Sequence, residues 1–307
     1  MMAVLQNIFK TKTEEKSRGL FATVEDLTAQ RRYALKARYA TRKDMTTARA
    51  GDVKSVFKGR GMEFEEIRAY AFGDDVRDID WRVTARKQVP YTKLFAEEKD
   101  REVYVILDLS PQMLFGTKRE LKTVAAAKAT ARIGWQSLLR KDRFGCLLSD
   151  GKDEVLLKAQ NTQANLMMIF KKIADMSQNV LNAPSEGSAA FDLMKAVKLL
   201  QQNIKHKAIV FVVSDFADFG NDGQKALALL AKKAEVTCVK VFDVIEKYPP
   251  QDGEYMAQQG RRRLVFSTQS EKFRQAYEQY FAEKFQKIRA FCRTFNLHYA
   301  EISTNGD

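Results

Sequence analysis

The sequence has few of the residues that catalytic, metal-binding or cross-linked proteins commonly use. Its 307 residues include two histidines, His206 and His298, and three scattered cysteines, Cys146, Cys238 and Cys292. Disulfide frameworks and zinc sites need more of these residues at closer spacing. The first two cysteines lie in strand-like runs and the third on a helix-like face. We therefore expect buried thiols, and not disulfides, metal ligands or a nucleophile.

The chain also lacks long apolar runs and a composition typical of disorder. No apolar stretch approaches the roughly 18 residues that span a membrane. The start, MMAVLQNIFKTKTEEKSRGLF, has too short an apolar stretch for a signal peptide. Five prolines and 15 glycines are too few for long disordered tracts. We expect a cytoplasmic protein with one large domain and an appendage.

The net charge of +13 is concentrated near the N-terminus. Residues 1–60 contain fourteen Lys or Arg residues against six Asp or Glu residues. We assign residues 1–45 to a basic N-terminal arm, whose charge would attract nucleic acid or an acidic lipid surface. The alternative is a solvated face on a partner-binding segment. We favour this alternative because the sequence has no signature of a known nucleic-acid-binding module.

From residue 103 onward, short apolar runs alternate with longer segments of helical periodicity. The runs are typical of buried strands: VYVILDLS, RFGCLLSD, AIVFVVSDF and VTCVKVFD. Residues 118–140, 161–176, 189–200 and 270–296 place apolar side chains at steps of three and four. This pattern predicts an α/β fold with a three-layer, doubly wound, mostly parallel sheet of the Rossmann type. The apolar stripe of the last helix should pack on the sheet, with a coiled-coil seam as the alternative.

Two glycine-containing turns predict hairpins. Asp150 and Gly151 lie between two apolar runs, which favours one antiparallel strand at an edge of the sheet. Gly260 lies at the centre of EYMAQQGRRRLVFS, where a second hairpin is expected.

Polar residues follow two of the predicted strands. Asp108 and Ser110 follow the first strand, Ser214 and Asp215 end a later one, and Ser188 lies in a loop between them. Ligands of doubly wound sheets bind beyond the carboxyl ends of the strands, so these oxygens should converge. Oxygen ligands without a nearby histidine or cysteine suit a hard divalent cation such as Mg²⁺. The alternative is a strand end whose Asp and Ser side chains cap the following turn.

These residues resemble the metal-ion-dependent adhesion site of von Willebrand factor A-like domains. That site combines an Asp-x-Ser-x-Ser sequence, a threonine from a middle loop and an aspartate after a later strand. More narrowly, residues 59–113 are similar to the bacterial family catalogued as domain of unknown function 58. The similarity rests on GDDVRDIDW at residues 73–81 and on its flanks GRGMEF and FAEEKDRE.

The resemblance implies a Mg²⁺ site at the carboxyl end of the sheet. Gln112 stands where the second serine would be and Ser188 where the threonine would be, so the site departs from the family pattern at both positions. The ligands that the resemblance implies are oxygen atoms of Asp108, Ser110, Gln112, Ser188 and Asp215.

The resemblance also implies a domain organisation and a partner. It places a family-specific extended or β-rich segment at residues 46–102 and a von Willebrand factor A-like domain at residues 103–307. Members of the family are thought to act with MoxR-type AAA+ ATPases. The expected function is therefore a non-enzymatic protein–protein interaction module, an adaptor that binds such an ATPase or a client offering a carboxylate.

Enzyme chemistry is not indicated by the other polar residues. The segment GDDVRDIDWRVTAR contains four aspartates within seven residues. It could form an acid–base pair or a metal cluster, but we favour a salt-bridge network anchored by Trp81. His206, at the entry end of a strand, and His298, inside the last strand, are poorly placed to activate a serine, and there is no P-loop. The alternatives to the adaptor are a nucleic-acid or acidic-surface binder and a metal-dependent hydrolase.

Overall fold

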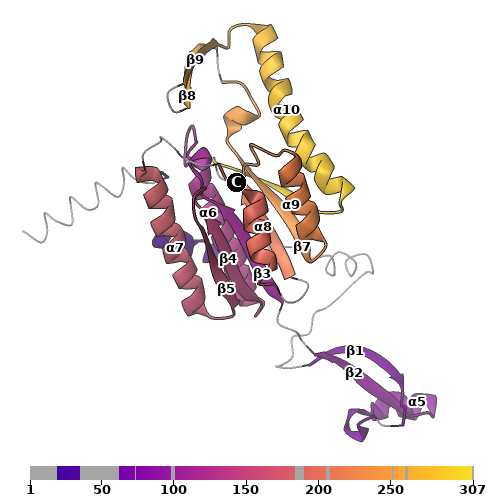
Figure 1. Cartoon of the computed structure of the whole chain (residues 1–307). Helices are drawn as coiled ribbons and strands as arrows, with labels where there is room; N and C mark the ends of the chain where they lie inside the picture. Colours follow the sequence, from indigo (N-terminus) through magenta and orange to yellow (C-terminus); the bar gives the residue numbers. More distant parts are fainter. Residues whose placement is uncertain are drawn as a thin grey trace, which may run out of the picture. The chain divides into compact units, whose positions relative to one another are not determined.

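The computed structural model describes residues 19–34, 62–72, 74–97, 101–183, 190–204, 208–250, 252–259 and 262–305. These residues form two compact units (Figure 1). The larger unit contains the described residues from 101 to 305 together with residues 19–34. The smaller unit contains the described residues from 62 to 97.

The larger unit is built on a six-stranded sheet with the order β10-β7-β6-β3-β4-β5. All neighbouring strands are parallel except β5, which is antiparallel to β4 at the edge. The parallel strands are rich in Val, Ile and Leu because both of their faces are covered. The strands are β3 (Glu102–Asp108), β4 (Arg143–Ser149), β5 (Glu154–Gln160), β6 (Ala208–Ser214), β7 (Ala234–Phe242) and β10 (His298–Ser303).

Helices cover both faces of this sheet. Alternate residues of a strand point to opposite faces, so Val105 and Leu107 contribute to one apolar cluster and Tyr104 and Ile106 to another. The first cluster contains α6 (Lys122–Leu139) and α7 (Gln163–Asn182). The second contains α8 (Leu193–Gln201), α9 (Asn221–Ala231) and α10 (Glu271–Thr294). The predicted three-layer, doubly wound, mostly parallel α/β fold is confirmed.

Both predicted hairpins are confirmed. The turn between β4 and β5 contains Gly151 at φ 88°, a backbone conformation that glycine adopts easily. Asp150 Oδ1 accepts hydrogen bonds from the backbone N–H groups of Lys152 and Asp153, both at 2.8 Å, and so fixes the turn. The second hairpin is shown by the antiparallel pairing of β8 (Glu254–Gln259) with β9 (Arg262–Ser267), whereas its predicted centre, Gly260, lies outside the described residues.

Helix α10 packs on the sheet through the C-terminal half of its apolar stripe. Phe285, Ile288, Phe291 and Cys292 are buried there, which confirms core packing as opposed to a coiled-coil seam. Its N-terminal half contacts the β8–β9 hairpin, where the ring of Phe273 stacks on Phe266 with 5.5 Å between centroids. All three cysteines are free and buried, as expected.

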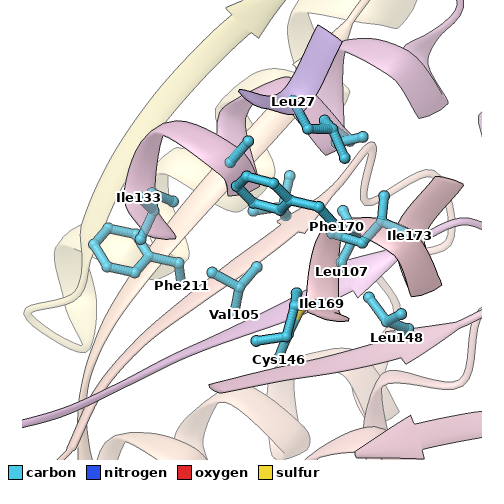
Figure 2. Close-up of a cluster of buried hydrophobic side chains, with 14 of the residues drawn as sticks. Leu27, Val105, Leu107, Ile133, Cys146, Leu148, Ile169, Phe170, Ile173 and Phe211 are labelled. Carbon is cyan, nitrogen blue, oxygen red and sulfur yellow. The ribbon is translucent and has the colours of Figure 1, made fainter. Parts of the chain in front are cut away.

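Residues 19–34 belong to the larger unit. Two short helices, α2 (Val24–Ala29) and α3 (Arg31–Ala34), contact α6 and α7. Leu27 is fully buried and its carbonyl accepts a hydrogen bond of 3.2 Å from the indole of Trp135 on α6. Figure 2 shows Leu27 among apolar side chains of α6, α7 and the sheet. This part of the predicted basic arm is therefore a packed layer of the α/β unit, because it supplies apolar side chains to the core.

The smaller unit is a hairpin with a short helical connection. Strand β1 (Met62–Ala69) pairs antiparallel with β2 (Tyr91–Glu97). Between them lie the 3₁₀ turn η1 (Val76–Asp78) and helix α5 (Trp81–Lys87). The described part of the family-specific segment is thus β-rich, as predicted.

We predict that Leu27→Ala lowers the free energy of unfolding by about 3 kcal/mol, because it leaves a cavity in a closed part of the core. Urea denaturation followed by circular dichroism measures this change. Leu20→Ala is the control, since Leu20 is 43% exposed and its truncation should cost less than about 0.5 kcal/mol. Equal effects of the two substitutions would show that residues 19–34 are not part of the folded unit.

Candidate functional site

The candidate site lies at the carboxyl end of the sheet, where β3 and β6 are neighbours. Asp108 is the last residue of β3 and Ser214 the last residue of β6. The strand after β3 in the chain, β4, lies on one side of β3, and the later strand β6 lies on the other side, so the order of strands reverses at β3. Ligands of doubly wound sheets bind at such a reversal, beyond the carboxyl ends of the strands. The Ser214 hydroxyl donates to Asp108 Oδ2 at 2.6 Å, and the Ser110 backbone N–H donates to Oδ1 at 2.9 Å. The structure thus brings Asp108, Ser110 and Ser214 together.

Asp108 is held in a strongly buried position. Its side chain is almost fully covered by protein. Burial raises the pKa of the Asp108 carboxyl to about 6, and the charge of Asp215 adds to this rise. The hydrogen bonds from Ser214 and Ser110 act in the opposite direction but do not outweigh burial. A carboxyl group in this environment would gain from a positive charge placed beside it.

Ser110 offers a free polar atom next to this carboxyl group. The residue is fully buried, and its Oγ has no hydrogen-bond partner among the described residues. A buried hydroxyl without a partner is uncommon and needs an explanation, such as a ligand or a water. Of the predicted ligands, Asp108 and Ser110 fit a bound cation best.

The Gln112 side chain is hydrogen-bonded to a residue of a neighbouring loop. It lies in the 3₁₀ turn η2 (Pro111–Met113). Its side-chain Nε2 donates a hydrogen bond of 3.2 Å to Asp218 Oδ2, in the loop after β6. Ser188 lies outside the described residues.

Asp215 is neutralised by a lysine that our sequence analysis did not single out. Lys122 Nζ lies 2.9 Å from Asp215 Oδ2 and 2.8 Å from Glu246 Oε1, in the turn η3 (Val244–Glu246). The Lys122 side chain is only 3% exposed. The predicted acidic ligand is therefore part of a buried ion-pair triad.

The sequence contained one signal for this triad. Helix α6 begins at Lys122, and the N-terminus of a helix carries a partial positive charge that disfavours a lysine. Burial lowers the pKa of the Lys122 ammonium, but the charges of Asp215 and Glu246 outweigh this and keep the pKa above its ordinary value. The unfavourable position of this lysine is therefore offset by the two buried carboxylates.

A second ammonium group lies on the other side of Asp215. Lys240 Nζ donates to the backbone carbonyl of Asp215 at 2.5 Å and lies 4.6 Å from the centroid of the Phe285 ring. Burial holds the pKa of Lys240 below its ordinary value, although Glu246 and Asp215 oppose the shift. Asp215 is therefore contacted by positive groups at both its carboxylate and its carbonyl.

Asp243 ties the loops around the site together. Its carboxylate accepts hydrogen bonds from the Thr117 N–H and hydroxyl at 2.9 and 2.7 Å, from the Thr304 hydroxyl at 2.5 Å and from the Ile245 N–H at 3.1 Å. Burial raises the pKa of Asp243, but these hydrogen bonds outweigh it and hold the pKa below its ordinary value. The carboxylate thereby joins the β3–α6 loop to the end of β7 and to the residue after β10.

These residues fit a divalent cation only in part. Asp108 and the free hydroxyl of Ser110 fit the donor set that Mg²⁺ prefers. Asp215 does not fit, because Lys122 already neutralises its carboxylate. Within the described ranges, no three His, Cys, Asp or Glu side chains are grouped so that they could hold a metal ion. The Mg²⁺ site stays a prediction, and we derive no step of the function from it.

The described residues form a small recess at this edge of the sheet. Its volume is about 40 Å³, and its lining includes Asp108, Gln112 and Asp218 together with the rings of Phe191, Phe216 and Phe219. His298 starts β10, so it lies at the opposite end of the sheet, where its Nε2 is 3.4 Å from Glu235. His206 lies outside the described residues. No described histidine is therefore near the recess.

The acidic motif of the smaller unit forms ion pairs, as predicted, and its aspartates also cap helices. Arg68 pairs with Asp74 at 2.7 Å, and Arg77 pairs with Asp75 at 2.7 Å. Hydrogen bonds from Arg77 lower the pKa of Asp75 to about 2. The Asp80 side chain caps α5 by accepting from two backbone N–H groups of its first turn.

The predicted anchoring role of Trp81 is wrong. Its side chain is 66% exposed, because Trp81 is the first residue of α5 and no side chain of this helix is buried. Phe72 is fully exposed as well. The segment is therefore held by polar contacts and leaves two aromatic rings at its surface.

The geometry defines a doubly wound α/β protein with a polar site at the switch point of its sheet. Residues 66–287 match the family described as "Protein of unknown function DUF58". The chain belongs to this family, as its resemblance implied.

Curated relatives include two mycobacterial proteins. They are the uncharacterized protein Rv1480 of Mycobacterium tuberculosis and the uncharacterized protein Mb1516 of Mycobacterium bovis. Each is 28% identical over 215 residues, which is 70% of this chain and 66% of the relative. The match thus spans slightly less than two thirds of the length of these relatives.

Two solved structures from Bacteroides show a weak likeness. One is the conserved hypothetical protein BatB of Bacteroides thetaiotaomicron, with a TM-score of 0.40 and 15% identity. The other is described as an aerotolerance-related membrane protein of Bacteroides fragilis, with a TM-score of 0.40 and 13% identity. Each match covers 66% of this chain and 90% of the solved chain. A TM-score of this size supports no further inference.

In the part of the chain that the structure describes, no helix combines the length and the apolar character needed to cross a membrane.

We predict that Asp243→Asn lowers the free energy of unfolding by about 2 kcal/mol at pH 7, because an amide cannot accept all of these hydrogen bonds. A carboxylate whose pKa is lowered by folding stabilises the protein above its unfolded pKa and loses this effect as pH falls. The deficit of the variant should therefore shrink as pH falls below about 4. Urea denaturation at a series of pH values measures it.

The control for this prediction is Asp222→Asn. The Asp222 side chain is 86% exposed and pairs only loosely with Lys225, at 3.5 Å. Its substitution should change the free energy of unfolding by less than about 0.5 kcal/mol at every pH. A deficit of Asp243→Asn that does not change with pH would contradict the prediction.

Proposed function

We propose that the chain is a non-enzymatic protein–protein interaction module of the von Willebrand factor A-like type, acting as an adaptor. The family resemblance implies a MoxR-type AAA+ ATPase, or a client of such an ATPase, as the partner. The contact region in this proposal is the carboxyl end of the sheet around Asp108, and a second one is formed by the exposed rings of Phe72 and Trp81.

The observation that carries the proposal is the size and lining of the recess beside Asp108. Sites that enclose small-molecule substrates commonly have volumes of roughly 300–1,000 Å³, whereas this recess has about 40 Å³. It has room for one ion, water or side-chain group from a partner. The nearby carboxylates provide hydrogen-bond acceptors, and three phenylalanine rings provide apolar surface around them.

The absence of a nearby base supports a binding role over hydrolysis. The Ser214 hydroxyl donates a hydrogen bond to the carboxylate of Asp108. An aspartate in this role orients the hydroxyl, but hydrolysis by a serine also needs a group that transfers its proton to a leaving group. No described histidine is close enough for this role.

The exposed rings of the smaller unit support a protein partner. Phe72 and Trp81 are exposed within that unit, and Val76 and Val89 are at least half exposed. Large exposed apolar side chains are available for contact with another protein, and tryptophan is enriched among residues that dominate such contacts. The positively charged Arg82 and Arg86 lie on the same short helix.

The alternatives stay predictions. Most of residues 1–45, on which nucleic-acid binding depends, lie outside the described residues, and in the described part Arg31 lies over the Trp135 ring at 5.3 Å. The cytoplasmic location and the Mg²⁺ dependence inferred from the sequence also remain to be tested.

We predict that Asp108→Ala and the double substitution Phe72→Ala/Trp81→Ala each reduce recovery of the partner by about tenfold, as expected when a dominant contact is removed. The measurement is an affinity pull-down from native lysate, in Mg²⁺ and in chelator, with quantitative mass spectrometry. An AAA+ ATPase should be the main protein recovered by the wild type.

Tyr280→Ala is the matched control, because Tyr280 is a 54% exposed ring on α10 in the larger unit. It should leave recovery unchanged. Recovery that is indifferent to all three variants would refute the proposed contact regions. Recovery of nucleic acid with its usual companions, or phosphate release that depends on Asp108, would favour one of the alternative functions.

A further inference from the structure

A buried lysine neutralises Asp215, one of the residues that the family pattern expects to act at a metal. Lys122 Nζ contacts the carboxylates of Asp215 and Glu246 at 2.9 and 2.8 Å. All three side chains are largely buried, with 3%, 6% and 19% exposure for Lys122, Asp215 and Glu246. Burial of a carboxylate without a positive partner is costly in free energy. The ammonium group of Lys122 is therefore needed to compensate the buried charges of Asp215 and Glu246.

Each partner of Lys122 is held in place by further hydrogen bonds. Asp215 Oδ1 accepts the backbone N–H of Ala217 at 3.0 Å, which leaves Oδ2 for the ammonium group. Glu246 Oε2 accepts the backbone N–H of Asp243 at 2.9 Å in a reciprocal capping arrangement, which leaves Oε1 for the same ammonium group. Asp215 Oδ2 and Glu246 Oε1 are therefore both held in position to accept from the single ammonium group of Lys122.

A divalent cation at Asp215 would meet two positive groups. Lys122 lies at its carboxylate and Lys240 at its carbonyl, 2.5 Å from the oxygen. Charges of the same sign at such distances repel strongly in a buried setting. A metal on Asp215 Oδ2 would compete with Lys122 and would break one of the two buried ion pairs of its ammonium group.

We infer that the ammonium group of Lys122 permanently occupies the cation position beside Asp215 and Glu246. Its ammonium group supplies to Asp215 the positive charge that a divalent metal supplies in metal-dependent adhesion sites, so the site is formed and stable without a divalent ion. The inference deepens the proposed function, because an adaptor built in this way would bind its partner in the presence of a chelator. The cation itself can be tested without any partner.

The test compares the wild type with Lys122→Met in two measurements. Thermal unfolding is followed in EDTA and in saturating MgCl₂, and binding of Mn²⁺, a probe for Mg²⁺, is followed by electron paramagnetic resonance of the free ion. We expect no Mg²⁺-dependent change in the melting temperature of the wild type and no Mn²⁺ binding that Mg²⁺ displaces. Lys122→Met frees two carboxylates, so its melting temperature should rise by about 3 °C or more with Mg²⁺. Its Mn²⁺ affinity should exceed that of the wild type by at least about tenfold.

Lys128→Met is the matched control. Lys128 is a partly buried lysine on the same helix that pairs with Glu120, which is not a member of the triad. It should gain neither the Mg²⁺-dependent stability nor the Mn²⁺ binding. Wild-type protein that binds Mn²⁺ in competition with Mg²⁺, or a Lys122→Met variant as indifferent to Mg²⁺ as the wild type, would overturn the inference.

The result can be read even if Lys122→Met does not fold. In that case the wild-type measurement decides, because saturable Mn²⁺ binding that Asp108→Ala abolishes contradicts a resident lysine, and its absence supports one. These measurements need no partner protein. A failed pull-down would therefore count against the proposed function and leave the inference about Lys122 unaffected.

Discussion

The parallel pairing of β3 with β6 is the constraint on which the candidate site depends. Both strands are apolar on both faces, and each fully buried Val, Leu or Ile side chain contributes about 2 kcal/mol. The register that pairs Leu107 with Val213 then places Asp108 beside Ser214. The hydrogen bond between those two side chains contributes about 1 kcal/mol net. Apolar burial therefore positions the polar site, and the hydrogen bonds only refine it.

The loops at this end of the sheet are held by buried charges that are compensated within the protein. Lys122 joins the start of α6 to the loop after β6 and to η3. Asp243 joins the β3–α6 loop to the end of β7 and to Thr304. Because these carboxylates have partners already, they need no ligand to be stable. A site ordered in advance loses less entropy when a partner binds.

Much of this fold could be predicted because its signals are local. The apolar runs, the helical stripes and the turn at Asp150 each act over a few residues, and the position of Asp108 follows from the general rule for doubly wound sheets. The start of an apolar helix at Lys122 was a local signal, but the partners of this lysine could not be predicted, since Glu246 is 124 residues away in the chain. The role of Leu27 was missed for the same reason. Its residue type indicates burial, but only the three-dimensional structure shows that α6 and α7 cover it.

The smaller unit is stabilised in a different way, and this determines which of its residues can contact a partner. Its described ion pairs are partly or largely exposed, and water screens such pairs so that they contribute little to stability. The cap formed by Asp80 fixes the start of α5, so Trp81 occupies the first helical position and its ring does not turn inward. Because Trp81 is 66% exposed, its ring contributes little to the stability of its own unit. Its burial against another protein would contribute more, which is why the acidic motif and the rings beside it fit a binding surface better than a structural anchor.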